Sequence, residues 1–330
     1  MSANTQTPET HEAKWARILR EAKKKAQASY DDTLEEVQKA IMEANPKVTK
    51  EEIRKEAEEV FKKLMGDSVL KPITVEVKAP KKPTKKVEKA HYNFEKLVRI
   101  VGNCALNCAL IGEAGTGKTF GALQLGDVLE MKNWLVSFAP TDRKHEVKGF
   151  LDANGRFHAP AIKNAYVQGG LLILDEYDRA NPEVSIAMNA LLSGDTYMFA
   201  DNKMYKKHKD FRVVACQNTT GMGPSKRYTA ARAQDGSTLN RFVRLDWDTD
   251  EALETSICGN TVATRAVQQM RKNARNLSMD SLIISPRQSI HANKLVNEGG
   301  FSVADALKHS VTLGLPEDTQ KRLMANVKLS

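Results

Sequence analysis

The 330-residue sequence is poor in cysteine and has no long apolar run, and both shortages exclude classes of protein. Four cysteines cannot supply a disulfide framework for a chain of this length, so a reducing compartment, the cytoplasm, is expected. No apolar run approaches the ~18 residues of a membrane span. The chain begins with polar residues, which predicts neither a signal peptide nor a transit peptide. We therefore expect a cytoplasmic protein with no membrane partner.

Signatures of metal centres and of common hydrolases are also missing. Cys104 and Cys108 are four residues apart, but no histidine or second cysteine pair lies near them in the sequence. Buried free thiols are therefore favoured over a metal pair. No zinc spacing, catalytic triad or protease signature occurs in the chain.

The positive charge of the chain is concentrated in one short stretch. The formal net charge is +9, and residues 78–89 hold six lysines against one glutamate, a net of +5. Such a lysine- and proline-rich stretch cannot bury a core, so residues 78–90 are predicted to be an extended linker. Its lysines could also contact nucleic-acid phosphates, but a solvated tether is favoured because no aromatic residue is present to stack on a base.

A phosphate-binding motif lies between residues 112 and 119. Gly112, Gly117, Lys118 and Thr119 satisfy the pattern G-x-x-x-x-G-K-[ST], between an apolar run and a segment with helical apolar spacing. The loop would place phosphates at a helix N-terminus, with the lysine beside the β- and γ-phosphates and the threonine hydroxyl on Mg²⁺. We expect ATP and Mg²⁺ here, with the nucleotide held by Gly112, Glu113, Ala114, Gly115, Thr116, Gly117, Lys118, Thr119 and Phe120.

A second motif follows about 55 residues later, where four apolar residues precede Asp175 and Glu176. A buried strand that ends in two acids would place both carboxylates at the edge of the sheet where the phosphate loop lies. Asp175 is expected to bind the metal together with Thr119, and Glu176 to polarise the water that attacks the γ-phosphate.

The order of apolar runs and helical patterns predicts an α/β fold, a P-loop domain with a parallel sheet covered on both faces. Strands are expected at residues 105–111, 134–138, 170–174, 211–215 and 242–245, and only helices after residue 248. The predicted domains are an N-terminal helical module (1–77, ending in a short strand at 73–77), the linker (78–90), the α/β nucleotide-binding domain (91–249) and a helical lid (250–330).

Several further segments make residues 91–300 resemble the AAA+ ATPases, and more closely their MoxR-type branch, which includes the CobS-like ATPase subunit of cobaltochelatase. The segments are a β-hairpin at 149–157, Asp178-Arg179-Ala180-Asn181-Pro182-Glu183 after the acids, Gln217-Asn218-Thr219, Leu239-Asn240-Arg241-Phe242 and Ser285-Pro286-Arg287. Asn240 departs from the aspartate that is usual in the family.

The resemblance implies roles for three of these residues. Asn218 would position the attacking water, Arg287 would reach the γ-phosphate from the lid, and Arg241 would reach the γ-phosphate of a neighbouring subunit. Arg227, Arg232 and Arg244 are further candidates for that last role. An arginine that acts in trans requires a homo-oligomeric ring, expected to be a hexamer.

The sequence thus predicts a Mg²⁺-dependent ATPase ring that remodels a protein partner. The resemblance suggests a partner with a von Willebrand A-type domain, and a role in metal insertion into a tetrapyrrole. Two alternatives stay open: a nucleic-acid motor or clamp, and a non-catalytic nucleotide-dependent scaffold. Two stretches are candidates for the output, residues 148–157 and the basic residues 203–209, and the latter is equally well explained as a solvated hairpin tip.

Overall fold

A computed structural model describes residues 73–77 and 85–329; residues 1–72, 78–84 and 330 lie outside this description. The helices that we expected in the N-terminal module therefore lie outside the described residues. The short strand expected at the end of that module is present as β1 (Ile73–Val77).

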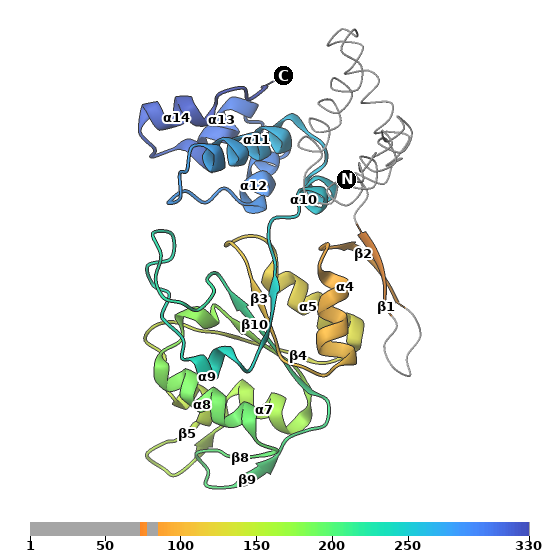
Figure 1. The fold of residues 1–330 in the computed structure, drawn as a ribbon, viewed down its shortest axis with the longest axis vertical. Helices are drawn as coiled ribbons and strands as arrows, with labels where there is room; N and C mark the ends of the chain where they lie inside the picture. The colour runs from red at the N-terminus through yellow and green to blue at the C-terminus, as the bar shows by residue number, and fades with distance from the viewer. Residues whose placement is uncertain (1–72, 78–84, 330) are drawn as a thin grey trace, which may run out of the picture.

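A five-stranded parallel sheet forms the centre of the structure (Figure 1). Its strands, in spatial order, are β11 (Val243–Asp246), β3 (Cys108–Ile111), β10 (Phe211–Gln217), β7 (Gly170–Asp175) and β4 (Asn133–Ser137). Every neighbouring pair is parallel. The five predicted strands are all present, with ends shifted by at most three residues, and the predicted α/β class is confirmed.

Helices cover both faces of the sheet, so the central strands are buried on both sides. Within β7, Leu171 and Ile173 belong to one hydrophobic core while Leu172 and Leu174 belong to the other, as the two-residue period of a strand requires. The first core is closed by α4 (Phe94–Leu97), its π-helical continuation (Val98–Asn103) and α5 (Lys118–Leu129). The second core is closed by α6 (His145–Lys148), α7 (Ala161–Gln168) and α8 (Pro182–Ser193).

Two short hairpins extend from the sheet domain, at the end of the molecule farthest from the C-terminal helices (Figure 1). The expected hairpin is formed by β5 (Phe150–Leu151) and β6 (Phe157–His158). The second pairs β8 (Thr196–Met198) with β9 (Met204–Lys206), so part of the basic stretch 203–209 is a strand and not a hairpin tip. The reason is Tyr205, which packs edge-on against Phe199 and lies under the ammonium group of Lys163, 4.1 Å from the ring centre.

The prediction of an extended linker at residues 78–90 is wrong for its second half. Residues 85–90 form β2 (Lys85–Ala90), which pairs antiparallel with β1. Val87 and Ala90 are buried in the same core as Phe94 and Leu97. The prediction was based on the number of lysines and overlooked these two apolar positions. They are three residues apart, and two apolar residues at that spacing do not form the alternating pattern of a strand.

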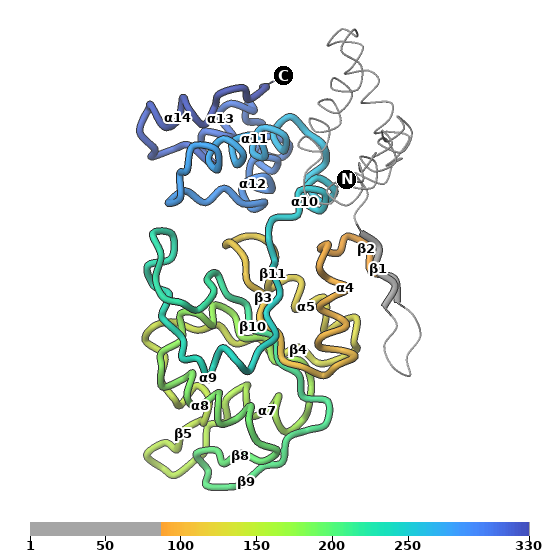
Figure 2. The backbone as a smooth tube through the Cα atoms, in the orientation of Figure 1, coloured from red at the N-terminus to blue at the C-terminus, as the bar shows by residue number. Residues whose placement is uncertain are grey.

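The C-terminal part of the chain is helical and has its own core. The chain leaves β11 and continues directly into α10 (Figure 2). The helices are α10 (Glu251–Cys258), α11 (Val262–Asn276), α12 (Pro286–Asn297), α13 (Val303–Leu307) with a π-helical continuation (Lys308–Thr312), and α14 (Glu317–Leu323). Helices α11 to α14 pack around Met270, Ala292 and Leu307. Within the described ranges, no helix has the length and apolar character to cross a membrane.

Candidate nucleotide-binding site

The loop between β3 and α5 has the backbone that a phosphate cradle needs. Gly115 and Gly117 have φ values of 84° and 85°, in the left-handed region where glycine is favoured. Gly117 is the N-cap of α5, so the loop leads into a helix N-terminus, which favours anions. The space around Gly117 is open, since a Cβ there would meet no atom within 4 Å.

Lys118 is buried beside this loop, with 7% of its surface exposed. Its ammonium group donates hydrogen bonds to the carbonyl oxygens of Gly112 and Glu113, both at 2.7 Å, and to Asn218 Oδ1 at 2.9 Å. Burial lowers the pKa of Lys118 to about 8, and the negative groups nearby only partly offset this. The ammonium group of Lys118 thus lies where phosphate oxygens could replace the loop carbonyls as its hydrogen-bond acceptors.

Thr119 and Asp175 meet at the edge of the sheet, and their oxygens suit a magnesium ion. The Thr119 hydroxyl donates to Asp175 Oδ1 at 3.0 Å. Mg²⁺ commonly takes only one or two protein oxygens and completes its shell with phosphate and water. In residues 85–329 no group of three or more His, Cys, Asp or Glu side chains that could hold a metal ion occurs.

Glu176 follows Asp175 directly, in an unusual backbone conformation. Its φ of 53° is left-handed, which is uncommon for a residue with a side chain. Its carboxylate forms an ion pair with Arg179 at 2.7 Å, and about one third of each side chain is exposed. Glu176 therefore lies beside the metal-ligand candidates but is held by a neighbouring cation.

Asn218 is fixed at the end of β10 by a buried carboxylate. The backbone N–H of Asn218 donates to Asp178 Oδ2 at 3.1 Å, and the Thr219 hydroxyl donates to the same oxygen at 2.9 Å. Asp178 is only 1% exposed. Asp178 belongs to one of the segments that resemble the AAA+ ATPases, but its task, to hold the residue that contacts Lys118, is visible only in the structure.

The loop after β10 lies over the phosphate loop, which the sequence did not predict. The hydroxyl of Tyr228 accepts a hydrogen bond from the backbone N–H of Ala114 at 2.9 Å. Arg227 forms an ion pair with Glu113 and donates to the carbonyl oxygen of Asp280 in the helical part. Tyr228 therefore bonds an N–H of the kind that cradles phosphates, and nothing in a lone tyrosine's sequence context signals this.

The start of α12 also contacts the phosphate loop. A Cβ placed on Gly115 would lie 2.3 Å from Ser285 Oγ and 3.4 Å from the Cβ of Arg287. Glycine at this position therefore allows the helical part to approach the loop. Of the three residues with roles implied by family resemblance, Asn218 and Arg287 are thus close to the phosphate loop.

Arg241 lies elsewhere. Its guanidinium group donates to the carbonyl oxygens of Asn189 and Ser237 and to Ser193 Oγ, on α8 and α9 (Gly236–Leu239). These contacts hold it at a different part of the surface from Lys118. Arg232 and Arg244 are exposed, and Arg227 is engaged by Glu113 of its own phosphate loop.

Trp247 packs behind the phosphate loop and was also missed. A Cβ on Gly112 would lie 2.0 Å from the Trp247 carbonyl oxygen, and one on Gly121 would lie 2.4 Å from its ring. The ring of His91 stacks on the other side of the indole at 4.1 Å. These contacts support the loop from the end of β11.

The fold and the site define an α/β domain with a P-loop. Residues 107–232 match the family model described as AAA domain (dynein-related subfamily). This stretch contains the phosphate loop, the two acids and Asn218. A comparison with curated proteins found no match.

A comparison with solved structures finds matches of low similarity. They include the Thermotoga maritima RuvB Holliday junction branch migration motor (14% identity, TM-score 0.40, covering 66% of this chain and 68% of that one). Another is NtrX from Brucella abortus in complex with ATP (15% identity, TM-score 0.38, covering 75% of this chain and 55% of that one). A third is a closed-state reconstruction of Hsp104 with ATPγS and FITC casein (12% identity, TM-score 0.39, covering 67% of this chain and 44% of that one).

Proposed function

We propose that the chain is a Mg²⁺-dependent ATPase that works as a homo-oligomeric ring and remodels a protein partner. The observation that carries the proposal is the convergence of four side chains from three segments of the chain. Thr119 meets Asp175 at 3.0 Å, and Lys118 meets Asn218 at 2.9 Å. A lysine, a metal-ligand pair and a polar amide around a glycine loop form the set that phosphoryl transfer needs.

In this proposal each residue has a distinct task. Thr119 and Asp175 would hold a magnesium ion, which would supply positive charge beside the β- and γ-phosphates. Lys118 faces the same charge, and Asn218 orients the attacking water. Glu176 accepts the proton of that water, which requires its carboxylate to leave Arg179. Arg287 acts from the lid and Arg241 from a neighbouring subunit.

The two hairpins support an output directed at a protein. Phe150 and Leu151 on β5 are each 48% exposed, and Met198 and Met204 on the other hairpin are 46% and 59% exposed. Large apolar side chains gathered at one end of a domain are typical of a surface that contacts another polypeptide. A von Willebrand A-type partner, metal insertion into a tetrapyrrole and a six-membered ring remain hypotheses suggested by the family resemblance.

A nucleic-acid motor is the second candidate, because the β8–β9 hairpin is also basic. Lys203, Lys206 and Lys209 lie on or next to β9, where they could contact phosphates. Lys207 is less available, since it pairs with Asp195 at 3.4 Å. Binding to nucleic acid would weaken steeply with salt, whereas docking of an apolar hairpin would not.

The first test is phosphate release from ATP, with and without Mg²⁺, for the wild-type chain and for Lys118→Ala. Release that depends on Mg²⁺ and is lost in the variant supports the ATPase assignment. Equal release by both proteins, or none by the wild type, contradicts it. Stimulation by DNA or RNA with a steep salt dependence would favour the second candidate.

The second test uses a Glu176→Gln variant as a trap for the partner, with Phe150→Ala in the same chain. We expect the trap to retain a protein and the added hairpin substitution to release it. Phe301→Ala is the matched control, because Phe301 is a similarly exposed phenylalanine (41%) in the helical part. Equal retention by both double variants would contradict the role of the hairpin.

A further inference from the structure

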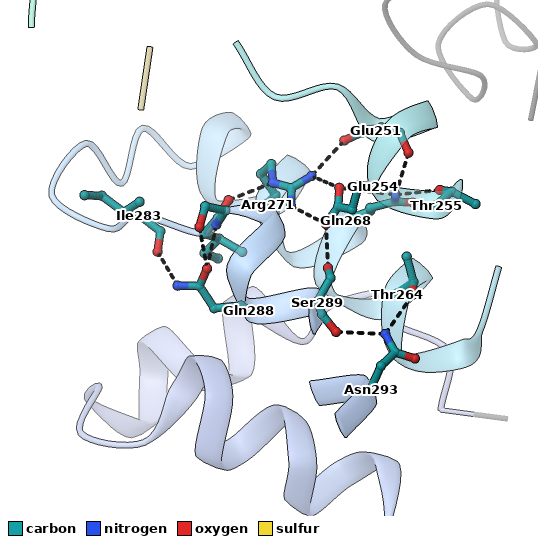
Figure 3. A network of polar contacts seen from close by, with 12 residues as sticks. Glu251, Glu254, Thr255, Thr264, Gln268, Arg271, Ile283, Gln288, Ser289 and Asn293 are labelled. Carbon is teal, nitrogen blue, oxygen red and sulfur yellow. Dashed lines mark hydrogen bonds and ion pairs between the residues drawn. The ribbon is translucent and has the colours of Figure 1, made fainter. Parts of the chain in front are cut away.

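A buried ion pair lies among the C-terminal helices (Figure 3). Arg271 on α11 and Glu254 on α10 are each 2% exposed. Two nitrogens of the guanidinium group donate to the two carboxylate oxygens of Glu254, both at 2.8 Å. Glu251 accepts a longer bond of 3.3 Å, and the hydroxyl of Ser289 on α12 also donates to Glu254. One charged cluster thus joins three helices.

The same guanidinium group also reaches out of the cluster to the chain just before α12. Arg271 Nε donates to the carbonyl oxygen of Ile284 at 2.7 Å. Gln288 holds the neighbouring groups: it donates to the Ile283 carbonyl at 3.1 Å and accepts from the N–H and the hydroxyl of Ser285, both at 2.8 Å. Segment 283–285 is therefore clamped by two side chains (Figure 3).

This clamped segment leads directly into the residues that contact the phosphate loop. Ser285 Oγ and the Cβ of Arg287 are the atoms that a Cβ on Gly115 would meet, at 2.3 and 3.4 Å. A shift of the Ile284 carbonyl would move Ser285 and the first turn of α12 with it. The position of Arg271 is thus linked to the phosphate loop through two residues of backbone.

The stability of the folded helices alone does not explain a buried ion pair at this position. A buried pair adds little net stability, because desolvation offsets the attraction, and an apolar pair of similar volume can pack as well. A guanidinium group has what an apolar side chain lacks, a rigid fork whose N–H groups point in fixed directions. Because Glu254 fixes two of those directions, the Nε–H direction toward Ile284 is fixed too.

We propose that Arg271 is a positioning residue that, held by Glu254, sets Ser285 and Arg287 against Gly115 of the phosphate loop. The proposal rests on the proposed function in one respect, that Arg287 acts on the γ-phosphate. Arg271 itself touches no nucleotide atom in this scheme and acts through segment 283–287.

The test compares Arg271→Lys with Arg265→Lys, a control on the exposed face of the same helix. Lysine keeps the charge but cannot bond Glu254 and Ile284 together. We expect kcat for ATP to fall about 10- to 100-fold in Arg271→Lys, with ADP affinity unchanged. In an Arg287→Ala background, Arg271→Lys should not lower kcat further, because both substitutions remove the same interaction, that of Arg287 with the γ-phosphate. Additive losses in the double variant would overturn the proposal.

A second measurement separates this proposal from the ATPase assignment. Hydrogen exchange of the Ser285 and Gln288 amides should be at least about tenfold faster in Arg271→Lys, with α13 and α14 unchanged. Unchanged exchange at Ser285 and Gln288 would overturn the positioning role even if the chain hydrolyses ATP. If the wild type hydrolyses no ATP but the exchange responds as expected, the proposed function fails while the positioning of segment 283–287 stands.

The double variant Arg271→Met/Glu254→Leu is the control for misfolding of Arg271→Lys. It replaces the ion pair by apolar side chains that can pack. A double variant that keeps the wild-type melting temperature but shows the same fall in kcat supports positioning. A stable double variant with wild-type kcat contradicts it.

Discussion

The ammonium group of Lys118 donates a 2.9 Å hydrogen bond to the side-chain oxygen of Asn218, a residue one hundred positions away in the chain. The two residues belong to β3's loop and to the end of β10, which are neighbours in the sheet. Lys118 is buried where it makes this contact, and burial lowers the pKa of its ammonium group, which leads to a prediction about pH.

ATP binding should take up a proton above pH 8. Burial lowers the pKa of Lys118 to about 8, so below this pH the lysine is charged before and after binding. Above it, the free protein has a neutral lysine that must be protonated to face the phosphates, and Kd should rise by up to about tenfold per pH unit. Calorimetry at pH 8.5 in buffers of different ionisation enthalpy measures the uptake. Equal heats in all buffers would contradict the prediction, and pH 7 provides the control, where uptake should be close to zero.

Glu176→Gln should bind ATP but hydrolyse it very slowly. Glutamine keeps the size of the side chain and removes the proton acceptor, so the rate should fall by about 100-fold or more while the phosphate contacts are unaffected. The variant should also accumulate the assembled ring when ATP is present. Light scattering measures its size, and a monomer in the presence of saturating ATP would count against the ring.

Tyr228→Phe should bind ATP more tightly than the wild type. The hydroxyl of Tyr228 accepts the N–H of Ala114, which a phosphate would otherwise use. A net hydrogen bond of about 0.5–1.5 kcal/mol corresponds to a gain of about 2- to 10-fold in affinity. Tyr205→Phe is the control, since that hydroxyl bonds Asp201, far from the phosphate loop. Weaker ATP binding in Tyr228→Phe would show that the hydroxyl assists binding and does not compete.

The parts of this site that the sequence predicted are those fixed by local pattern. The glycine loop, the two acids and the five strands each follow from residues adjacent in the chain. The positions of Tyr228 and Trp247 and the task of Asp178 were missed because they depend on contacts between residues that lie 40 to 156 positions apart. A single tyrosine or tryptophan carries no period and no spacing from which such a contact could be read.

The β2 strand was missed for a different reason. Its lysines suggested a solvated tether, yet the burial of Val87 and Ala90 decides its place. Net charge counts every lysine equally and does not register which neighbouring positions are buried. Composition therefore predicted the wrong structure where two buried positions were enough to determine it.

Gly121→Ala should destabilise the sheet domain although alanine is the better helix former. A Cβ at this position would lie 2.4 Å from the ring of Trp247, which is itself 1% exposed and stacked on His91. Overpacking of this kind costs about 1–3 kcal/mol, more than the ~1 kcal/mol gained in helix propensity. Thermal denaturation should show a lower melting temperature. Gly236→Ala is the matched control, because a Cβ there meets nothing within 4 Å, and that variant should be as stable as the wild type or slightly more so.

Mixing two inactive variants should restore ATP hydrolysis if Arg241 acts in trans. Within its own chain Arg241 is bonded to Ser193, Ser237 and Asn189, and not to the phosphate loop. An Arg241→Ala subunit keeps a complete phosphate loop, and a Lys118→Ala subunit keeps Arg241. In a mixed ring, an interface between an Arg241→Ala subunit and a Lys118→Ala subunit can therefore contain both an intact phosphate loop and Arg241. Neither homo-oligomer has an interface with both. Each variant alone should be nearly inactive, and a 1:1 mixture should regain about one quarter of the wild-type rate, because half of the phosphate loops are intact and half of their neighbours supply the arginine. Arg244→Ala in place of Arg241→Ala tests the exposed alternative on β11. If the mixture stays inactive although light scattering shows mixed rings, Arg241 acts within its own chain or not at all.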